Sequence, residues 1–522
     1  MPQIVRRFEG RVVINEDDHC DTVSRRPMAE HRAKWFDSEA LLILGMLTLF
    51  LGVNLWTATR FPIPWYDEIQ FVDPAANLYF ENSFTTTAYR WEGSTDLHAH
   101  HPLYSLVLAG WFEITGFGLT HARALNYVLM TGTVLAVWFA AIRTKLVPSA
   151  TYRVVLVLLL LLGYSMSFPY RTGRIEPLLM LLSAMLWLIF TIKNRGLRLV
   201  LLAGATLLFA PAGLHLVVFT GAFICLLAVY LQRQVFVEAA VIGTALLLST
   251  AGLFSFYALA GVWDNAVAAV MPHTTSGGLG ALLTDMELTH INKLPKDPSL
   301  VILLGVLLLL VAIKVGRGQF RSHSVLSFGV AVSVTIPVVL LRTAKFPTYY
   351  SWMVFAPLAV CVCSALSEMR PRRWAKFTLH TGLALACIMG LPFQLLAVTY
   401  DWHDRNHQAV ETIVDAHVGK SDWVLCDYQV YFPAKMRASK VFLPEYLAKM
   451  TPEEKSKISL VIASDEALIR WSLVLGGQWD RVGEGMVPSQ TTMLKRLTGK
   501  NVDVGLIGRK YRFDVYRRRA GT

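Results

Sequence analysis

The chain has 522 residues, of which 54% are hydrophobic and only 16% are charged, and its mean hydropathy is +0.45. A soluble protein carries about a quarter of charged residues, so the composition excludes an ordinary soluble protein. The formal net charge is +12, but Lys and Arg fall mainly in short clusters between apolar blocks. That arrangement indicates orientation in a membrane and argues against nucleic-acid binding.

Eleven apolar blocks of spanning length follow one another along the chain, if about 20 residues are taken per span. They lie at 39–58, 122–142, 152–169, 176–192, 197–213, 214–231, 237–260, 299–315, 324–341, 351–367 and 377–399. Basic clusters alternate with loops that hold few cations, and the positive-inside rule places these clusters in the cytoplasm. The sequence therefore predicts an α-helical polytopic membrane protein with about 11 transmembrane helices.

The segment PLYSLVLAGWFEITGF (102–117) is apolar, but it is short and contains Glu113. If it spanned the membrane, every later helix would reverse and each basic cluster would face outward. We therefore expect an interfacial helix that lies along the outer leaflet. The predicted organisation is a cytoplasmic tail (1–38), a transmembrane domain (39–399) with outer loops at 59–121 and 262–298, and an extracytoplasmic C-terminal domain (400–522).

The C-terminal part differs from the rest of the chain. DWVLCDYQVYF (422–432), ISLVIAS (458–464) and VDVGLIGRKYRFDVYRR (502–518) have the composition of short β-strands, and the last contains a Gly-Arg-Lys turn typical of a hairpin. PEYLAKMTPEEKSK (444–457) and DEALIRWSLVL (465–475) have helical spacing. This part is predicted to be a small α/β domain.

Two adjacent carboxylates, Asp67 and Glu68, occur in FPIPWYDEIQF (61–71), directly after the first apolar block. Partial loss of solvent at a membrane edge raises the pKa of a carboxylate and makes it a better base. Two interfacial carboxylates that face water beside aromatic residues would give the same pattern, so the dipeptide alone does not decide between the two interpretations.

Cations at the same predicted side of the membrane favour a chemical role. In FPYRTGRIEPLL (168–179), Arg171, Arg174 and Glu176 lie at the outer boundary between two apolar blocks, where ionisable groups are rare. Guanidinium groups bind phosphate in a bidentate way. A second cationic segment, RTAKFPTYY, contributes Arg342, Lys345, Tyr349 and Tyr350. Together the cations and tyrosines of these two segments predict a site for the phosphate of a donor molecule, and Glu176 is a candidate for contact with the acceptor or the lipid.

Histidines form a further group in DLHAHHPLY, at His98, His100 and His101. Imidazole is a common metal ligand, but this spacing is not a recognised zinc pattern. A divalent metal, contact with the acceptor or the lipid phosphate, and no role at all stay open as alternatives. His215, within an apolar block, is expected to be a packing residue.

The order of these motifs resembles that of the C-type (GT-C) membrane glycosyltransferases, and within them the protein O-mannosyltransferase and aminoarabinose transferase branch (families 39 and 83). The residues that carry the resemblance are PWYDE (64–68), HHPLYSLVLAGWF (100–112), THARALNYV (120–128), YRTGRIEPLLMLL (170–182) and KFPTYYSWMVFAPLAV (345–360).

The resemblance implies transfer of a sugar from a polyprenyl-phosphate carrier to an acceptor hydroxyl by inverting displacement. Asp67 matches the family's general base, and Glu68 would position Asp67 or the acceptor. Arg171 and Arg174 match the family's arginine less tightly, while Lys345, Tyr349 and Tyr350 would neutralise the leaving phosphate. It also implies a C-terminal domain that recognises the acceptor, which could be a glycan, a lipid or a protein. The lack of an organellar retention signal and the compact C-terminal domain favour a bacterial inner membrane.

Three other functions remain as alternatives. A polysaccharide polymerase or ligase would use the outer cations for a pyrophosphate-linked glycan. A transporter or flippase would guide a phosphorylated, lipid-linked cargo, although no internal repeat of the kind common in transporters is found. A non-catalytic assembly protein would keep the fold and bind through its C-terminal domain.

Overall fold

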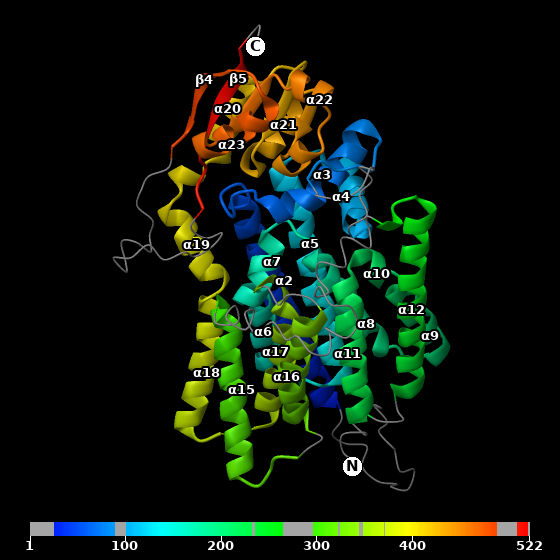
Figure 1. Cartoon of the computed structure of the whole chain (residues 1–522). Helices are drawn as coiled ribbons and strands as arrows, with labels where there is room; N and C mark the ends of the chain where they lie inside the picture. Colours follow the sequence, from blue (N-terminus) through cyan, green and yellow to red (C-terminus); the bar gives the residue numbers. More distant parts are fainter. Residues whose placement is uncertain are drawn as a thin grey trace, which may run out of the picture.

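The computed structural model describes residues 26–88, 101–231, 235–264, 296–321, 324–343, 348–369, 371–487 and 509–519. The predictions for His98, His100 and Lys345, and for the side chain of Arg342, fall outside the described part. Figure 1 shows a long helical bundle with a small α/β region stacked on one end. Helix α2 begins near the opposite end of the bundle and runs toward this region.

The helices of the bundle follow the apolar blocks of the sequence. They are α2 (Arg26–Trp56), α5 (Leu119–Thr144), α6 (Ala150–Leu162), α7 (Tyr164–Arg171), α8 (Glu176–Phe190), α9 (Arg195–Leu207), α10 (Phe209–Ala212), α11 (Leu214–Leu231), α12 (Phe236–Leu259), α15 (Pro298–Gly316), α16 (Val325–Thr343), α17 (Trp352–Glu368), α18 (Arg373–Ile388) and α19 (Leu391–Tyr400).

Among the described residues, six helical segments are long and apolar enough to cross a membrane, and two bent pairs raise this number to eight. Three shorter apolar helices, α8, α16 and α17, fall on the remaining predicted blocks. The class of polytopic helical membrane protein is thus confirmed. Eleven crossings stay a prediction, because the short helices do not meet the length of a span.

The two bent pairs meet at their bends. Helices α6 and α7 turn by 45° at Gly163, and α18 and α19 turn by 44° at Gly390. A Cβ atom on Gly390 would overlap the Leu162 carbonyl oxygen and the Tyr164 amide nitrogen. Only glycine lets the two backbones approach so closely, so the bends are part of the packing.

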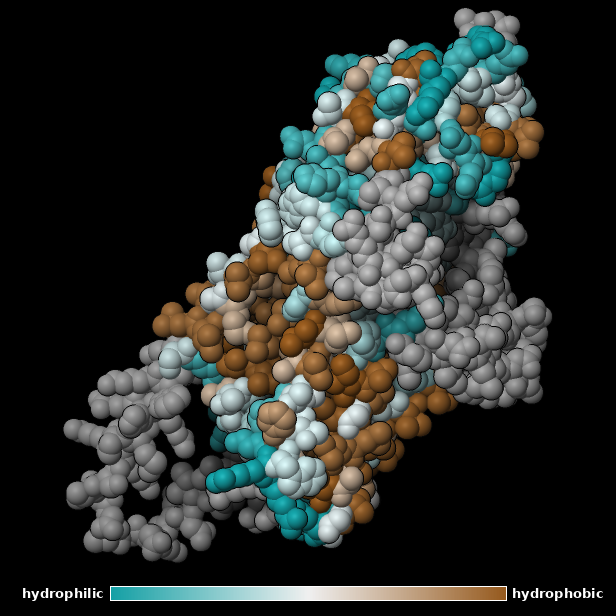
Figure 2. Space-filling model, turned by 90° about the vertical axis from the view of Figure 1, so that its left-hand side faces the viewer, coloured by the Kyte–Doolittle hydropathy of each residue, from teal (hydrophilic) through white to brown (hydrophobic). Residues whose placement is uncertain are grey.

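The surface agrees with a membrane setting. Figure 2 shows hydrophobic residues over the middle of the molecule and hydrophilic residues at its upper end, over the α/β region. Large apolar side chains are exposed on α18 and α19, at Trp374, Phe377, Leu385, Ile388 and Leu396. An apolar surface of this kind is stable in lipid and unfavourable in water.

Two helices lie between the bundle and the α/β region: α3 (Tyr66–Glu81) and α4 (Pro102–Thr115). Helix α4 has 14 residues, too few for a span, which fits the helix predicted over 102–117. It packs on α3 and on the start of α5. These two helices carry or flank most of the candidate site.

The α/β region holds a five-stranded sheet in the order β2-β1-β3-β5-β4. Strands β1 (Trp423–Cys426), β2 (Lys440–Phe442) and β3 (Leu460–Ala463) are parallel, whereas β5 (Phe513–Arg518) runs antiparallel to β3 and to β4 (Trp479–Met486). All four residues of β3 are buried, as expected for a strand covered on both faces.

The helices of this region are short and flank the sheet. They are η5 (His403–Arg405), α20 (His407–His417), η6 (Tyr428–Val430), α21 (Tyr431–Arg437), η7 (Pro444–Ala448), α22 (Pro452–Lys457) and α23 (Asp465–Leu475).

The predicted elements of this region are found in part. The helix over 465–475 is α23, and the predicted helix over 444–457 is divided into η7 and α22 by Thr451, which caps α22 with Glu454 in a capping box. The strand predicted over 422–432 is correct only for β1, because its second half forms η6 and α21. The first arm of the predicted hairpin lies outside the described residues, and its second arm is β5.

His407, at the start of α20, is buried where the α/β region meets the bundle. Its Nδ1 atom lies 2.8 Å from the Tyr511 hydroxyl. Burial lowers the pKa of His407 to about 3, and the positive charges of Arg123 and Arg60 act in the same direction. The imidazole is therefore neutral at neutral pH.

Acid should destabilise the fold through His407. In the unfolded chain a histidine takes up a proton below about pH 6.5, whereas the folded chain resists this until about pH 3. The stabilisation is complete above pH ~6.5 and is lost as the pH falls toward the folded pKa, by about 2 kcal/mol at pH ~5. Unfolding of the full chain in detergent, followed at neutral and acidic pH, checks this. The variant His407→Gln should show a smaller pH dependence, and an equal dependence in both chains would contradict it.

Candidate active site

The first turn of α3 carries Asp67 and Glu68. Trp65 precedes the helix in an extended conformation (φ −143°, ψ 170°), so the chain enters α3 from an extended segment. Carboxylates in a first turn interact favourably with the positive end of the helix dipole. Because consecutive residues of a helix are about 100° apart, the two side chains face different surroundings.

Glu68 points into the bundle and binds Arg123 of α5. Arg123 Nε donates to one carboxylate oxygen (2.7 Å) and Nη2 to the other (2.6 Å), and both side chains are fully buried. Burial raises the pKa of Glu68, and the Arg123 guanidinium opposes this shift. The third arm of Arg123 donates to the Ala58 carbonyl. This pair attaches the start of α3 to both α5 and the end of α2.

Gly173 makes room for Glu68. Its φ is +64°, a left-handed conformation, and a Cβ atom there would lie 2.4 Å from Glu68 Oε1. The neighbouring backbone is held by Asn126, whose Nδ2 donates to the Arg174 carbonyl (3.0 Å), and by Tyr104, whose hydroxyl donates to Asn126 Oδ1 (3.0 Å). The turn between α7 and α8 is thus fitted to α3 by shape and by hydrogen bonds.

Arg174 is the centre of a second ionic group. Its guanidinium binds Glu176, with Nη2 2.9 Å from Oε1 and Nε 3.1 Å from Oε2, and it also forms an ion pair with Asp67. The ring of Tyr349 covers the guanidinium, with Cζ 3.7 Å from the ring centroid. Of the three charged side chains, Asp67 is the most exposed, at 17%. One cation is shared by two carboxylates, so the formal charge of the group is −1.

Arg171 does not join this group. Its guanidinium donates to Asn54 Oδ1 (2.7 Å), to Thr57 Oγ1 (2.8 Å) and to the Phe61 carbonyl (3.1 Å), all at the end of α2 or just after it. These contacts satisfy backbone and side-chain acceptors at a helix end. The structure therefore does not bring Arg171 to the Asp67 carboxylate, although the sequence places both at the same boundary.

Aromatic rings extend the site away from Arg174. The Tyr349 and Tyr350 ring centroids are 4.8 Å apart, Tyr350 lies 4.7 Å from His215, and His215 lies 5.3 Å from His101. His101 is thus near the site, and His215 is packed against it. Within the described part of the chain, no three His, Cys, Asp or Glu residues are grouped in a way that could hold a metal ion.

The structure thus gathers Asp67, Glu68, Arg174, Glu176 and Tyr349 at one end of the bundle. Arg123 lies in the motif THARALNYV but is not among the predicted site residues. An available signal was its position at the start of an apolar helix that the basic clusters predict to begin on the outer side, where a cation opposes the positive-inside rule.

The arrangement of the helical bundle, of helices α3 and α4 and of the C-terminal sheet is similar to that of two solved structures of ArnT. The crystal structure of ArnT from Cupriavidus metallidurans bound to undecaprenyl phosphate has a TM-score of 0.58 with this chain. The match covers 92% of this chain and 98% of ArnT, at 12% sequence identity. Apo ArnT from the same organism gives a TM-score of 0.55, also at 12% identity, over 91% and 98% of the two chains.

No protein-family model and no curated protein sequence matches the chain. At 12% identity the similarity to ArnT establishes the fold. The chain is a multi-pass membrane protein of this fold, and its chemistry has to be argued from its own site.

Breaking the Glu68–Arg123 pair from one side should destabilise the protein strongly. Glu68→Met or Arg123→Met leaves the partner charge buried without compensation, which costs about 3–5 kcal/mol. The double variant removes both charges and should lose much less than the sum of the two single changes. Thermal unfolding of the four chains in detergent measures this cycle. Additive losses would show that the two side chains do not act as a pair.

Proposed function

We propose that the protein transfers a sugar from a polyprenyl-phosphate carrier to an acceptor hydroxyl at the outer face of the cytoplasmic membrane. The observation that carries this proposal is Asp67, a partly exposed carboxylate at the edge of an otherwise buried ionic group. The fold supports the proposal, because ArnT, which shares it, has been crystallised with undecaprenyl phosphate.

Asp67 is suited to act as the general base. Arg174 fixes its carboxylate on one side, and its exposed surface leaves room for a hydroxyl to approach. A base must lie within about 2.6–3.2 Å of the atom whose proton it takes. Glu68 and Glu176 are fully buried and bound to arginines, so of these three carboxylates Asp67 is the one accessible to an acceptor.

The proposed reaction is a single displacement. The acceptor oxygen attacks the anomeric carbon as its proton passes to Asp67, while the bond from that carbon to the phosphate oxygen breaks and polyprenyl phosphate leaves with the electron pair. Attack from the face opposite the leaving group inverts the anomeric centre. Such reactions pass through an oxocarbenium-like state with positive charge on the sugar. The formal charge of −1 on Asp67, Arg174 and Glu176 favours that state.

The leaving phosphate requires cations. The described partners of Arg174 are two carboxylates, so we propose that Arg174 contributes only part of the charge. Lys345 and Arg342, with Tyr349 and Tyr350, are proposed to supply the rest, and Arg171 would act from a greater distance. His98, His100 and His101 are proposed to contact the acceptor or the lipid.

The proposed orientation follows the basic clusters of the sequence. It places the N-terminus in the cytoplasm and the C-terminal region outside, in the periplasm of a bacterial cell, where the acceptor would be a glycan, lipid or protein. A polymerase or ligase would instead use a pyrophosphate-linked glycan, and a flippase would move its lipid without any bond being broken.

Asp67→Asn should lower the rate of transfer strongly. Loss of a general base costs about 10²–10⁴-fold in kcat, while KM for the donor should change little because the side chain keeps its size. The assay uses purified protein, a panel of polyprenyl-phosphate sugars and envelope extracts as acceptors.

A matched control is Glu113→Gln on α4, an exposed carboxylate outside the ionic group. It should transfer at the wild-type rate. Transfer by Asp67→Asn at the wild-type rate would exclude the proposed base, and movement of the lipid without release of its sugar would favour the flippase.

A further inference from the structure

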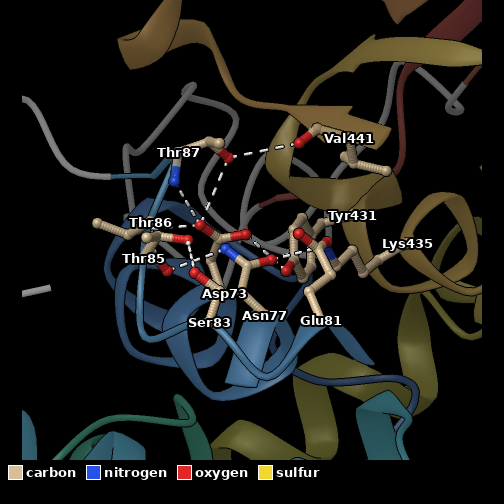
Figure 3. Close-up of polar contacts among 10 residues, drawn as sticks. All are labelled: Asp73, Asn77, Glu81, Ser83, Thr85, Thr86, Thr87, Tyr431, Lys435 and Val441. Atoms are coloured by element: carbon tan, nitrogen blue, oxygen red, sulfur yellow. Dashed lines mark hydrogen bonds and ion pairs between the residues drawn. The ribbon is translucent and has the colours of Figure 1, made fainter. Parts of the chain in front are cut away.

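The C-terminal region contacts α3, the helix that carries Asp67, through hydrogen bonds and an ion pair. Figure 3 shows side chains of α21 reaching the middle and the end of α3. The Tyr431 hydroxyl donates to Asp73 Oδ1 (2.7 Å). Lys435 Nζ donates to Asn77 Oδ1 (2.6 Å) and forms an ion pair with Glu81.

The contacting residues of α3 lie on one face. Asp73, Asn77 and Glu81 are four residues apart, which places them in a row along a helix. Tyr66, seven residues before Asp73, lies on the same face, and its ring centroid is 5.4 Å from that of Tyr428 in the C-terminal region. One face of α3 therefore meets the C-terminal region from its first turn to its last.

The opposite face of α3 meets the bundle. Glu68, Val72, Ala75 and Ala76 are fully buried, and Glu68 binds Arg123 there. Helix α3 is thus held between two bodies, with Asp67 at its start.

The contacts with α21 are buried polar contacts. The side chains of Asp73, Asn77, Tyr431 and Lys435 are each less than a tenth exposed. Buried polar groups are costly unless they are paired in the right geometry, so this interface has one preferred register.

The loop after α3 completes this network. Asp73 also accepts hydrogen bonds from the Thr86 hydroxyl (2.9 Å) and the Thr87 amide (2.6 Å), and Asn77 Nδ2 donates to the Thr85 carbonyl (2.9 Å). Asp73 and Asn77 therefore depend on partners from both sides.

Helix α3 needs such support because it contains Pro74. A proline inside a helix removes a backbone hydrogen bond and weakens the helix at that point. Asp73 and Asn77, which are bound by α21, lie on either side of the proline. The contacts therefore hold together the two halves of the helix, the first of which carries the candidate base.

We propose that Tyr431 and Lys435 are positioning residues for the transfer reaction, and that docking of the C-terminal region through them sets the orientation of Asp67. This inference rests on the proposed function. It assigns to the C-terminal region a part in building the catalytic geometry, in addition to any contact with the acceptor.

The first test is kinetic. Lys435→Met should lower kcat about tenfold or more, since small displacements of a catalytic group are costly. KM for the donor should stay within about twofold, because Lys435 of α21 contacts the end of α3 that lies away from Asp67. The charge exchange Glu81→Lys with Lys435→Glu should restore much of the rate. Arg437→Gln is the matched control, because Arg437 lies on the same helix but pairs with Asp415 within the C-terminal region. A wild-type kcat in Lys435→Met would overturn the proposal.

The second test does not depend on transfer. Hydrogen exchange of the full-length protein in detergent reports on the backbone of α3. In Lys435→Met, the amides of the turn after Asp67 should exchange faster than in the wild type and in Arg437→Gln. Unchanged exchange in that turn would overturn the positioning role, even if the rate of transfer fell. If the wild type transferred no sugar, the proposed function would fail, and this measurement would still decide whether docking orders α3.

Discussion

The buried ion pair between Glu68 and Arg123 is the contact on which the geometry of the site depends. It joins the start of α3 to α5, and through the Ala58 carbonyl to the end of α2. Taking two charges out of water is expensive, and the cost is offset only when the geometry is good and the remaining donors are satisfied. Both oxygens of Glu68 and all three arms of Arg123 have partners here. The pair therefore favours one placement of the helix over others, and Gly173, which has no side chain, leaves space for Glu68 in that placement.

Helix α3 is held in this placement by contacts on two of its faces. Its inner face is fixed to the bundle, and its outer row of polar residues is bound by the C-terminal region. Asp67 lies between these two faces and meets Arg174 from the turn before α8. Its position is therefore defined by three parts of the chain that are far apart in sequence. In a site that acts by positioning and electrostatics, rigidity of this kind matters as much as the identity of the base.

The sequence predicted well those features that depend on local composition. Each apolar block became a helix or a pair of helices, and PWYDE, YRTGRIEP and the Tyr349–Tyr350 pair do meet at one end of the bundle. The sequence-based prediction failed where contacts with residues distant in the sequence determine the structure. Arg123 can be recognised as an anchor only when its contact with Glu68 is known. Arg171 binds at the end of α2, where Asn54 and Thr57 supply hydrogen-bond acceptors. In the C-terminal region, YQVYF has strand propensity but forms η6 and α21, while β4, with two glycines, is a strand because β5 pairs with it. Tertiary contacts override propensity in both cases.

The two adjacent acids at the start of α3, Asp67 and Glu68, have different surroundings because they are one residue apart on a helix. Glu68 and Asp67 are adjacent carboxylates, yet a rotation of about 100° along the helix brings each of them beside a different arginine. Both oxygens of Glu68 bind the Arg123 guanidinium in a buried site, so Glu68 serves as an anchor. Asp67 receives a guanidinium that Glu176 already shares, and it keeps an exposed side. A carboxylate whose oxygens are all bound to buried partners cannot contact a substrate, whereas a carboxylate with an incomplete set of partners can. By this argument the two adjacent acids have different settings: Glu68 is held as a buried anchor, and Asp67 keeps the exposed surface on which its proposed role as a base depends.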